Sequence, residues 1–397
     1  MAGDKLKSFQ LKNFKAVRDS GVIEFTPLTA FIGNNGSGKS SLIEGLQTYQ
    51  AIVENGLDKA MQRWRGFEYI WNQSVPHLPI PLNNGDKPYL SNPMEICLKG
   101  RLAKRDFSAS MSISQNNQRN GLFFKGEELA LDEDIRYSRN DSNKVTYTYP
   151  GLTDGNRNVP FQISENASVV DNSSLPATEF SQFVSSWQFL VLDAEIMGEP
   201  VLQKQIAGQV RLARNGSNIA EYLLDIRRLD ELVFEGIIET MKFVLPYAQE
   251  LDPTLTSELG RNVYLQMTEG PAQIPGWLLS TGTLRILAIL ALLRHPNPPS
   301  LIVIEEIENG LDPGSVGLIV EEIRNVVEEG KSQVIITTHS PYLLDLLILP
   351  HIIVVEREDG QPTFRRPADD DALIKWTEKF SPGKLYTMGR LSREYAR

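Results

Sequence analysis

Apolar and polar residues alternate along the first third of the chain with the two-residue period of β-strands. Residues 5–32 carry this alternation on both sides of a turn, which predicts a strand pair, and residues 94–124 predict an antiparallel sheet. Residues 57–95 are irregular and interrupted by prolines. Residues 126–176 are polar and rich in Asn, Asp and Ser, so they predict loops around one strand at 144–149.

The spacing becomes helical after residue 200. Residues 201–249 predict helices, with amphipathic stretches at 219–228 and 229–245. Asn218 and Asp230 precede these stretches and are of the residue types that cap helix N-termini. No heptad pattern continues far enough for a long coiled-coil arm, so we expect a helical part without one.

Several uninterrupted apolar runs are typical of buried structure. Residues 28–32, 301–304 and 334–338 are short and rich in β-branched residues, which predicts buried strands. Residues 286–293 predict a buried helix, and the dense apolar content of 179–192 also indicates buried structure. Buried strands that alternate with helices predict an α/β fold.

A glycine-rich motif follows the first buried run. Gly33, Gly38, Lys39 and Ser40 fill the pattern G-x-x-x-x-G-K-[ST]. A strand that ends in glycines and leads into a helix turns backbone N–H groups toward one point, which suits a polyphosphate. Lys39 would reach the β- and γ-phosphates, and the Ser40 hydroxyl would ligate Mg²⁺. The predicted nucleotide-binding residues are Gly33, Asn34, Asn35, Gly36, Ser37, Gly38, Lys39, Ser40 and Ser41. A chance glycine turn is the alternative, which the flanking strand and helix disfavour.

Two carboxylates follow the second buried strand. Strands that place acids at their carboxyl ends beside a phosphate loop hold Mg²⁺ and orient water. Glu305 would support the metal, and Glu306 would polarise the water that attacks the γ-phosphate. The alternative is that the strand simply reaches solvent at this point.

Two further stretches carry candidate chemistry. Ser280 and Gly282 stand at the start of the apolar helix and could cradle an anion, although a capped helix needs no more than this. His339 follows the third buried strand and could touch the γ-phosphate, although a histidine at a strand end is also an ordinary structural residue.

Composition and charge narrow the classes of protein. The chain has 397 residues, of which 41% are hydrophobic and 23% charged, as in ordinary globular proteins. Its one cysteine excludes an internal disulfide, and no zinc-ligand cluster is visible, which favours a reducing, cytoplasmic location. The first residues lack the apolar core of a signal peptide, and no apolar stretch is long enough to span a membrane, so we expect no membrane partner.

The formal net charge of −10 argues against a surface covered with nucleic-acid contacts but leaves room for a local groove. Basic residues gather near the N-terminus at Lys5, Lys7, Lys12, Lys15 and Arg18, and again in the last forty or so residues. Solvated faces with interspersed acids are the simpler interpretation of both clusters.

The order of these motifs resembles the ABC-type ATPase heads. Within them the chain is most similar to the short SMC/RecF-like ATPases, often labelled AAA, that occur beside bacterial phage-defence nucleases and in OLD-type proteins. The segments 11–15 (LKNFK), 214–220 (RNGSNIA) and 305–311 (EEIENGL) are typical of that group. The resemblance covers most of residues 5–50 and 200–355.

The resemblance implies a site shared between two subunits. Ser280 and Gly282 would form the signature motif that completes the nucleotide site of a second subunit, and Asp312 would cross the dimer interface. His339 would be the switch histidine that senses the γ-phosphate. ATP and Mg²⁺ would be the cofactors, and the heads would form a homodimer or a higher oligomer.

The chain departs from the broader ABC pattern in some positions. Glu305 stands where Asp is usual, and Thr281 and Thr283 replace a Gly and a Gln of the signature. Gln73 is a weak candidate for the Q-loop glutamine.

The expected architecture is one α/β P-loop head with a mixed sheet, an inserted β-rich lobe and a helical subdomain. The two ends of the chain, 1–95 and 259–397, would form the head, residues 96–194 the β-rich insertion, and residues 195–258 the helical subdomain.

The leading functional hypothesis is an ATP-binding and hydrolysing switch. Nucleotide-driven dimerisation of the heads would control a separate effector, a nuclease or a toxin, in bacterial anti-phage defence. A RecF-like DNA-binding repair ATPase is the main alternative. A nuclease in its own right is disfavoured because the residues after His339 are too few for an acidic metal-binding domain. A transporter head is disfavoured by the long insertion and the missing Q-loop.

Overall fold

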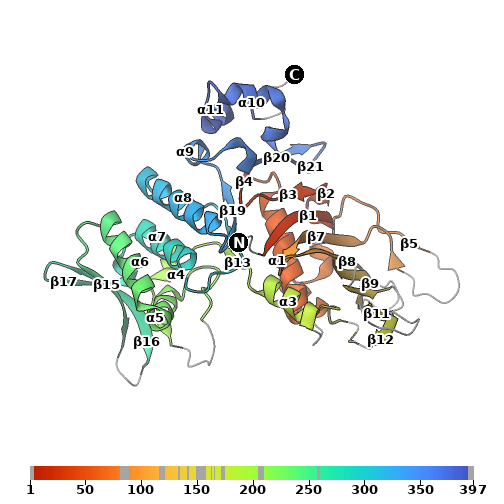
Figure 1. Cartoon of the computed structure of the whole chain (residues 1–397), viewed down its shortest axis with the longest axis horizontal. Helices are drawn as coiled ribbons and strands as arrows, with labels where there is room; N and C mark the ends of the chain where they lie inside the picture. The colour runs from red at the N-terminus through yellow and green to blue at the C-terminus, as the bar shows by residue number, and fades with distance from the viewer. Residues whose placement is uncertain are drawn as a thin grey trace. The chain divides into compact units, whose positions relative to one another are not determined.

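The computed structural model describes two compact units (Figure 1). The first comprises Met1–Trp187, Leu349–Trp376 and Gly389–Arg397, and the second comprises Gln188–Ile348 and Thr377–Met388. The described residues are 4–80, 89–115, 121–132, 135–140, 143–148, 158–161, 163–164, 166–170, 175–203, 210–256 and 260–391. Each unit thus combines segments that are distant in the sequence, while the four-segment division expected above stays a proposal.

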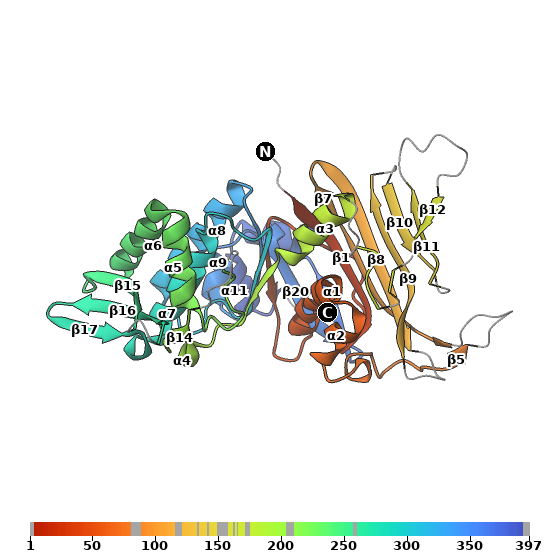
Figure 2. The same cartoon turned by 90° about the horizontal axis from the view of Figure 1, so that it is seen from below.

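An antiparallel sheet dominates the first unit. In the described part of the chain it has nine strands, in the order β12-β11-β10-β9-β8-β7-β1-β2, and β3 also pairs with β1. Figure 2 shows the strands side by side from β1 to β12. Their bounds are β1 Lys5–Phe14, β2 Val17–Asp19, β3 Ile23–Glu24, β7 Met94–Leu102, β8 Arg105–Gln115, β9 Leu122–Leu131, β10 Ile135–Arg139, β11 Val145–Thr148 and β12 Asn158–Phe161. A short separate pair is formed by β5 (Pro79–Ile80) and β6 (Tyr89–Leu90).

This sheet confirms the strand pair within 5–32, the antiparallel strands of 94–124 and the strand near 144–149. The expectation of loops over the rest of 126–176 was wrong in part, because β9 continues to Leu131 and β10 follows it. Leu129 and Leu131 of β9 and Tyr137 of β10 are buried at alternate positions of their strands. This two-residue period produces strands even though the residues between them are polar. The sheet therefore joins the middle of the chain to β1, through the pairing of β7 with β1.

The phosphate-loop elements lie in the same unit. β4 (Leu28–Ile32) is fully buried and pairs in parallel with β20 (Ile352–Glu358), which forms a hairpin with β21 (Gln361–Arg365). Helix α1 (Lys39–Asn55) follows β4, as predicted, and ends at Gly56. The remaining elements of this part are α2 Leu57–Gln62, η1 Phe67–Tyr69, α3 Leu175–Ser185, η3 Leu349–His351, η4 Pro367–Asp369 and α10 Asp371–Thr377. Residues 57–95 are therefore more regular than the prolines suggest.

Three parallel strands form the centre of the second unit. β13 (Gln188–Leu190), β18 (Leu301–Ile304) and β19 (Gln333–Thr338) pair in that order in register, and all their residues are buried. Helix α7 (Thr281–Leu293) precedes β18, and α8 (Pro313–Glu328) connects β18 to β19. The strands predicted at 301–304 and 334–338 and the buried helix at 286–293 are confirmed.

A smaller sheet and a helix pair complete the second unit. Helices α5 (Ile219–Leu229) and α6 (Glu231–Val244) confirm the amphipathic stretches, and Asp230 caps α6 through the N–H groups of Leu232 and Val233. The helical prediction for 201–249 was wrong at its start, where β14 (Val201–Leu202) is a strand. The other elements are α4 Ala194–Met197, β15 Glu250–Leu255, β16 Asn262–Glu269, β17 Ala272–Pro275, η2 Gly276–Leu278, α9 Pro341–Asp345 and α11 Pro382–Thr387.

No helix among the described residues has the length and apolar character required to cross a membrane.

Candidate functional site

The phosphate loop runs from the end of β4 into the first turn of α1. Lys39 is buried, and its Nζ donates to the carbonyl oxygens of Gly33 at 2.6 Å and Asn34 at 3.1 Å. The Ser37 N–H donates to the Asn34 carbonyl at 3.1 Å, which closes the turn. The loop carbonyls thus hold the ammonium group at the mouth of the helix, where the helix dipole also favours an anion.

Glycine is required at two positions of this loop because the β20–β21 hairpin approaches its backbone. A Cβ on Gly33 would lie 2.0 Å from the carbonyl oxygen of Val355. Gly38 has φ +118°, and a Cβ there would lie 2.7 Å from the Pro362 ring. The hairpin therefore fixes the shape of the loop from behind, and no larger residue fits.

The exposure of the predicted nucleotide-binding residues follows the curve of the loop. Asn34, Asn35, Gly36 and Ser40 are exposed at its tip and Ser41 is half-buried, whereas Ser37 is buried. The Ser37 Oγ atom is buried without a hydrogen-bond partner. Buried hydroxyls are normally paired, so this orphaned group is consistent with a ligand that accepts or donates a hydrogen bond there.

The acidic end of β18 is held by its neighbours in the second unit. The Glu305 N–H donates to the Leu190 carbonyl of β13 at 3.0 Å. Glu306 has φ +50°, a left-handed conformation that costs energy for a residue with a side chain, and its N–H donates to Thr337 Oγ1 at 2.8 Å. Asn309 Nδ2 donates to Glu306 Oε2 at 2.5 Å. The backbone of Glu306 is therefore strained, and the hydrogen bond from Asn309 orients its exposed carboxylate.

The strand end that carries His339 is tied to the same acidic loop. Glu308 Oε1 accepts a hydrogen bond from the His339 N–H at 2.5 Å, and its Oε2 is buried without a hydrogen-bond partner. The His339 side chain is half-buried. Glu306 and His339 are thus parts of one connected group at the carboxyl ends of β18 and β19.

The start of α7 lies against the loop that follows the acids. A Cβ on Gly282 would lie 2.7 Å from the Gly310 carbonyl oxygen, so only glycine fits there. Ser280 caps α7, because its Oγ accepts from the Thr283 N–H at 3.1 Å. Asp312 caps α8 by accepting from the Ser315 N–H at 3.1 Å and from its hydroxyl at 2.5 Å, and these hydrogen bonds lower the pKa of Asp312.

The capping contact of Ser280 agrees with the plainer alternative, a capped helix, and Asp312 also caps a helix. Both residues have a structural role within their own chain, and their action on a second subunit stays a prediction. Gln73 is exposed in the first unit, and its Nε2 donates to the carbonyls of Glu68 and Trp71, which gives it a local role in a loop.

The predicted site residues are divided between the two compact units. Lys39 and Ser40 belong to the first, and Glu305, Glu306 and His339 to the second. Within the second unit the structure brings together the acids, the histidine and the start of α7. The meeting of Lys39 with Glu306 and His339 around one triphosphate stays a prediction.

Sequence reasoning did not identify the contacts of three polar residues near the acids. Arg214 Nη2 lies 3.4 Å from Glu305 Oε1, Asn309 binds Glu306, and Glu308 binds the His339 backbone. The segments 214–220 and 305–311 already contained them, but a motif alone does not say which side chain contacts which. Their contacts required the fold.

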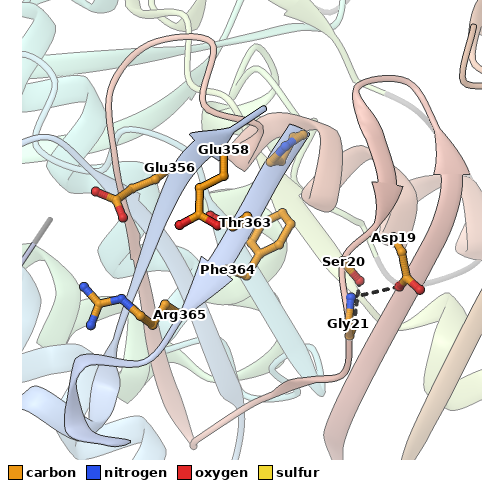
Figure 3. A pocket seen from close by; sticks show the side chains of 9 residues that line it. Asp19, Ser20, Gly21, Glu356, Glu358, Thr363, Phe364 and Arg365 are labelled. Carbon is orange, nitrogen blue, oxygen red and sulfur yellow. Dashed lines mark hydrogen bonds between the residues drawn. The ribbon is translucent and has the colours of Figure 1, made fainter. Parts of the chain in front are cut away.

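A cavity of about 270 Å³ lies elsewhere in the first unit (Figure 3). The turn at Ser20 and Gly21 forms one side and the β20–β21 hairpin the other, with Phe364 directed toward the turn. Among the described residues that line it, none was predicted as a site residue. It shares only Pro362 with the wall behind the phosphate loop.

Family models match both parts of the chain that carry these motifs. The model described as "AAA ATPase domain" matches residues 5–58, which include the phosphate loop. The model described as "AAA domain, putative AbiEii toxin, Type IV TA system" matches residues 156–345, which include the start of α7, the acidic strand end and His339. Both stretches are therefore similar to AAA ATPase domains, as the motifs predicted. No curated protein matches its sequence.

The chain is similar to solved SMC head domains at low sequence identity. The SMC head bound to the C-terminal winged-helix domain of ScpA is 15% identical, covers 91% of this chain and 97% of that one, and has a TM-score of 0.49. The Thermotoga maritima SMC head domain is 16% identical over 91% of this chain and 98% of that one, with a TM-score of 0.42. The Pyrococcus furiosus SMC head, bound to the C-terminal domain of ScpA, is 16% identical over 95% and 100%, with a TM-score of 0.47.

The residues present fit a magnesium–nucleotide group. Mg²⁺ prefers oxygen ligands and is usually bound by one or two protein groups together with substrate phosphates. The Ser40 hydroxyl in the first unit and the Glu305 carboxylate in the second unit are such groups, and the unpartnered Ser37 Oγ of the phosphate loop suits a hydrogen bond to a ligand oxygen.

Proposed function

We propose that this ATPase head is a Mg²⁺-dependent switch whose nucleotide state controls a partner effector. The observation that carries the proposal is the connected group at the ends of β18 and β19. Glu306 is held in a strained conformation by Thr337 and Asn309, and His339 is tied to Glu308. Such preorganisation suits a group that acts on a reacting water.

Each residue has a separable task in this proposal. Lys39 exchanges its loop carbonyls for the β- and γ-phosphates, and Ser40 and Glu305 hold Mg²⁺, which supplies charge neutralisation on the phosphates. Glu306 accepts a proton from the attacking water, oriented by its hydrogen bond to Asn309. His339 contacts the γ-phosphate and so distinguishes ATP from ADP.

In this proposal, the nucleotide shifts the equilibrium between separate and dimeric heads. A ligand shifts an equilibrium only if it contacts one state more strongly than the other. If Ser280, Gly282 and Asp312 complete the site of a second copy, ATP stabilises the dimer and hydrolysis releases it. The helix start at Ser280 suits a phosphate contact because the first N–H groups of α7 and the positive end of its dipole point outward from that end of the helix.

A role in bacterial anti-phage defence is the biological part of the proposal. It is supported by the description of the family model that matches residues 156–345, which places that family with AbiEii toxins of type IV toxin–antitoxin systems. A toxin or nuclease encoded beside this chain would be the effector. The protein would act in the cytoplasm as a homodimer or a larger assembly.

A RecF-like DNA-binding repair ATPase is the second candidate, and the N-terminal lysine cluster is what favours it. In the structure Lys7 pairs with Asp106, Lys12 with Glu95, and Lys15 with Glu44. Lysines paired with acids on their own chain are less available to phosphates, so this candidate ranks below the switch. DNA retention that falls with salt at a log–log slope of about −0.9 per neutralised phosphate would restore it.

Steady-state ATP hydrolysis by the purified chain tests the proposal. We expect Lys39→Ala to abolish nucleotide binding, because it removes the loop cation, whereas Lys59→Ala at an exposed position of α2 leaves binding unchanged. Glu306→Gln should bind ATP normally and hydrolyse it at least about a hundredfold more slowly. Turnover by Glu306→Gln equal to that of the wild type would reject Glu306 as the base.

A further inference from the structure

The segment 211–218 is a rigid loop whose own side chains build it. Asn218 Oδ1 accepts from the Ala213 N–H at 2.7 Å, and its Nδ2 donates to the Arg211 carbonyl at 2.9 Å. Asn215 Oδ1 accepts from the Ser217 N–H at 3.2 Å, and Gly216 takes φ +78°. These amides and the glycine account for the conformation of the motif R-N-G-S-N. The Arg214 side chain takes no part in these contacts.

The loop is attached beside the strand that carries Glu305. The Val191 N–H donates to the Arg214 carbonyl at 2.8 Å, and the Asp193 N–H donates to the Asn215 carbonyl at 3.0 Å. These two donors directly follow β13, which pairs in parallel with β18. Arg214 is therefore fixed by backbone hydrogen bonds at the carboxyl end of β18, where the acids begin.

The Arg214 side chain reaches the first of these acids. Its Nη2 lies 3.4 Å from Glu305 Oε1, and the side chains of Arg214 and Glu305 are 42% and 14% exposed. An ion pair with so exposed a partner adds little to folding stability. Because the loop nevertheless fixes Arg214 beside Glu305, we infer that the guanidinium group affects the electrostatics of the Glu305 carboxylate.

We propose that Arg214 is a positioning residue that competes with a divalent cation for the Glu305 carboxylate and thereby sets the metal affinity of the head. The inference rests on the proposed function, in which Glu305 supports Mg²⁺. A guanidinium cation on one carboxylate oxygen repels a metal ion that approaches the other oxygen, because like charges at short range oppose each other. Removal of the guanidinium takes one positive charge away from the Glu305 carboxylate and so strengthens the attraction of that carboxylate for a metal ion.

Manganese binding measures this competition directly. Mn²⁺ is titrated into the full chain with a non-hydrolysable ATP analogue, and free Mn²⁺ is followed by electron paramagnetic resonance. We expect Arg214→Ala to lower the half-saturating Mn²⁺ concentration about fivefold, in keeping with the modest strength of partly exposed charge pairs. Arg214→Lys keeps the positive charge and should stay close to the wild type.

Two further variants make the test specific. Arg211→Ala removes an exposed arginine from the same loop and should leave the Mn²⁺ titration unchanged, which controls for net charge. In a Glu305→Gln background, Arg214→Ala should shift the titration by less than twofold, because the carboxylate for which arginine and metal compete is absent.

Two results would overturn the inference. One is an Arg214→Ala titration that coincides with the wild type or requires more Mn²⁺. The other is an equal shift in the Glu305→Gln background, which would mean that Arg214 acts without Glu305. Nucleotide binding without metal, and its loss in Lys39→Ala, is measured in the same samples. If the wild type binds no nucleotide, the proposed function fails as well, whereas normal nucleotide binding with an unshifted Arg214→Ala rejects this inference alone.

Discussion

Glu306 combines features that rarely occur together in one residue. It is exposed, its backbone has φ +50°, and its carboxylate is nevertheless held by Asn309 at 2.5 Å. Non-glycine residues in left-handed conformations persist when surrounding contacts determine them, and such strain gathers at functional sites. The contacts that hold this residue should therefore matter more for turnover than for folding.

Asn309→Ala is expected to lower the ATP turnover number about tenfold while leaving nucleotide affinity within about twofold, because it frees the carboxylate without touching the phosphate loop. Turnover and binding are measured separately, by phosphate release and by titration of a fluorescent nucleotide. Asn325→Ala, in the last turn of α8, is the matched control. A turnover number for Asn309→Ala that equals the wild-type value would show that Glu306 needs no such support.

His295 makes the folding stability of the second unit depend on pH. It is buried and stacks on Tyr222, and burial lowers its pKa, although the nearby Asp225 charge acts in the opposite direction. Its folded-state pKa is thus below the unfolded value of about 6.5, so the unfolded chain binds the proton more readily. Stability is fully present above pH 6.5 and falls as the pH drops through 6.5 toward the folded-state pKa.

His295→Gln should therefore flatten the dependence of the unfolding free energy on pH between about 5 and 7, even if it lowers stability overall. Urea unfolding at several pH values, followed by circular dichroism, measures the slope. An unchanged slope would mean that other groups cause the acid sensitivity.

At the scale of elements, apolar periodicity predicted most strands and helices correctly. The sequence clearly predicts buried strands at 28–32, 301–304 and 334–338, since each run is short, β-branched and flanked by polar turns. The error at β10 has a physical reason. Its five residues alternate, but polar neighbours on both sides conceal so short a strand until the pairing with β9 is known.

Helix α1 shows how an element is fitted to its sheet at one position. Gly45 lies in the helix interior, and a Cβ there would come within 2.6 Å of Leu11 Cδ2 of β1. Leu11 is completely buried, and Phe9 lies 3.3 Å from the same Cβ position, so the site is crowded from two sides. The glycine is therefore set by close packing of helix on sheet, a cause that no sequence pattern reveals.

Gly45→Ala is expected to destabilise the first unit by about 1–3 kcal/mol through overpacking, although alanine favours helices. Gly317→Ala in α8 is the matched control. Its Cβ would meet only the Tyr342 hydroxyl, at 4.0 Å, so it should stabilise by about 0.5–1 kcal/mol. Chemical denaturation of both variants gives the sign of each change in unfolding free energy. A stabilising Gly45→Ala would contradict the close approach.

At the scale of the whole molecule, the sequence predicted the fold class and the order of the motifs, and both hold. It could not supply the side-chain contacts within the site, because Arg214 and Glu305 are ninety-one positions apart and meet only through β13 and β18. The sequence suggested both a helix cap and a phosphate contact for Ser280. The structure shows the cap, and the phosphate contact stays a prediction.

The action of the signature on a second copy can be tested by mixing inactive variants. Lys39→Ala lacks the phosphate loop cation, and Ser280→Arg blocks the start of α7. If each nucleotide site needs both chains, a mixed dimer retains one intact site, and the mixture should recover up to about a quarter of wild-type turnover. Circular dichroism confirms that Ser280→Arg folds. A mixture no more active than its separate components would assign the signature to its own chain.

The contact of Pro362 with Gly38 has a consequence for how the protein is made. The loop that would bind ATP follows β4 directly, yet the hairpin that shapes it from behind is synthesised only after β19. The loop therefore gains this wall late in synthesis, after the central strands of the second unit. A nascent chain that stops before β20 carries the whole motif but lacks the support that gives the loop its shape.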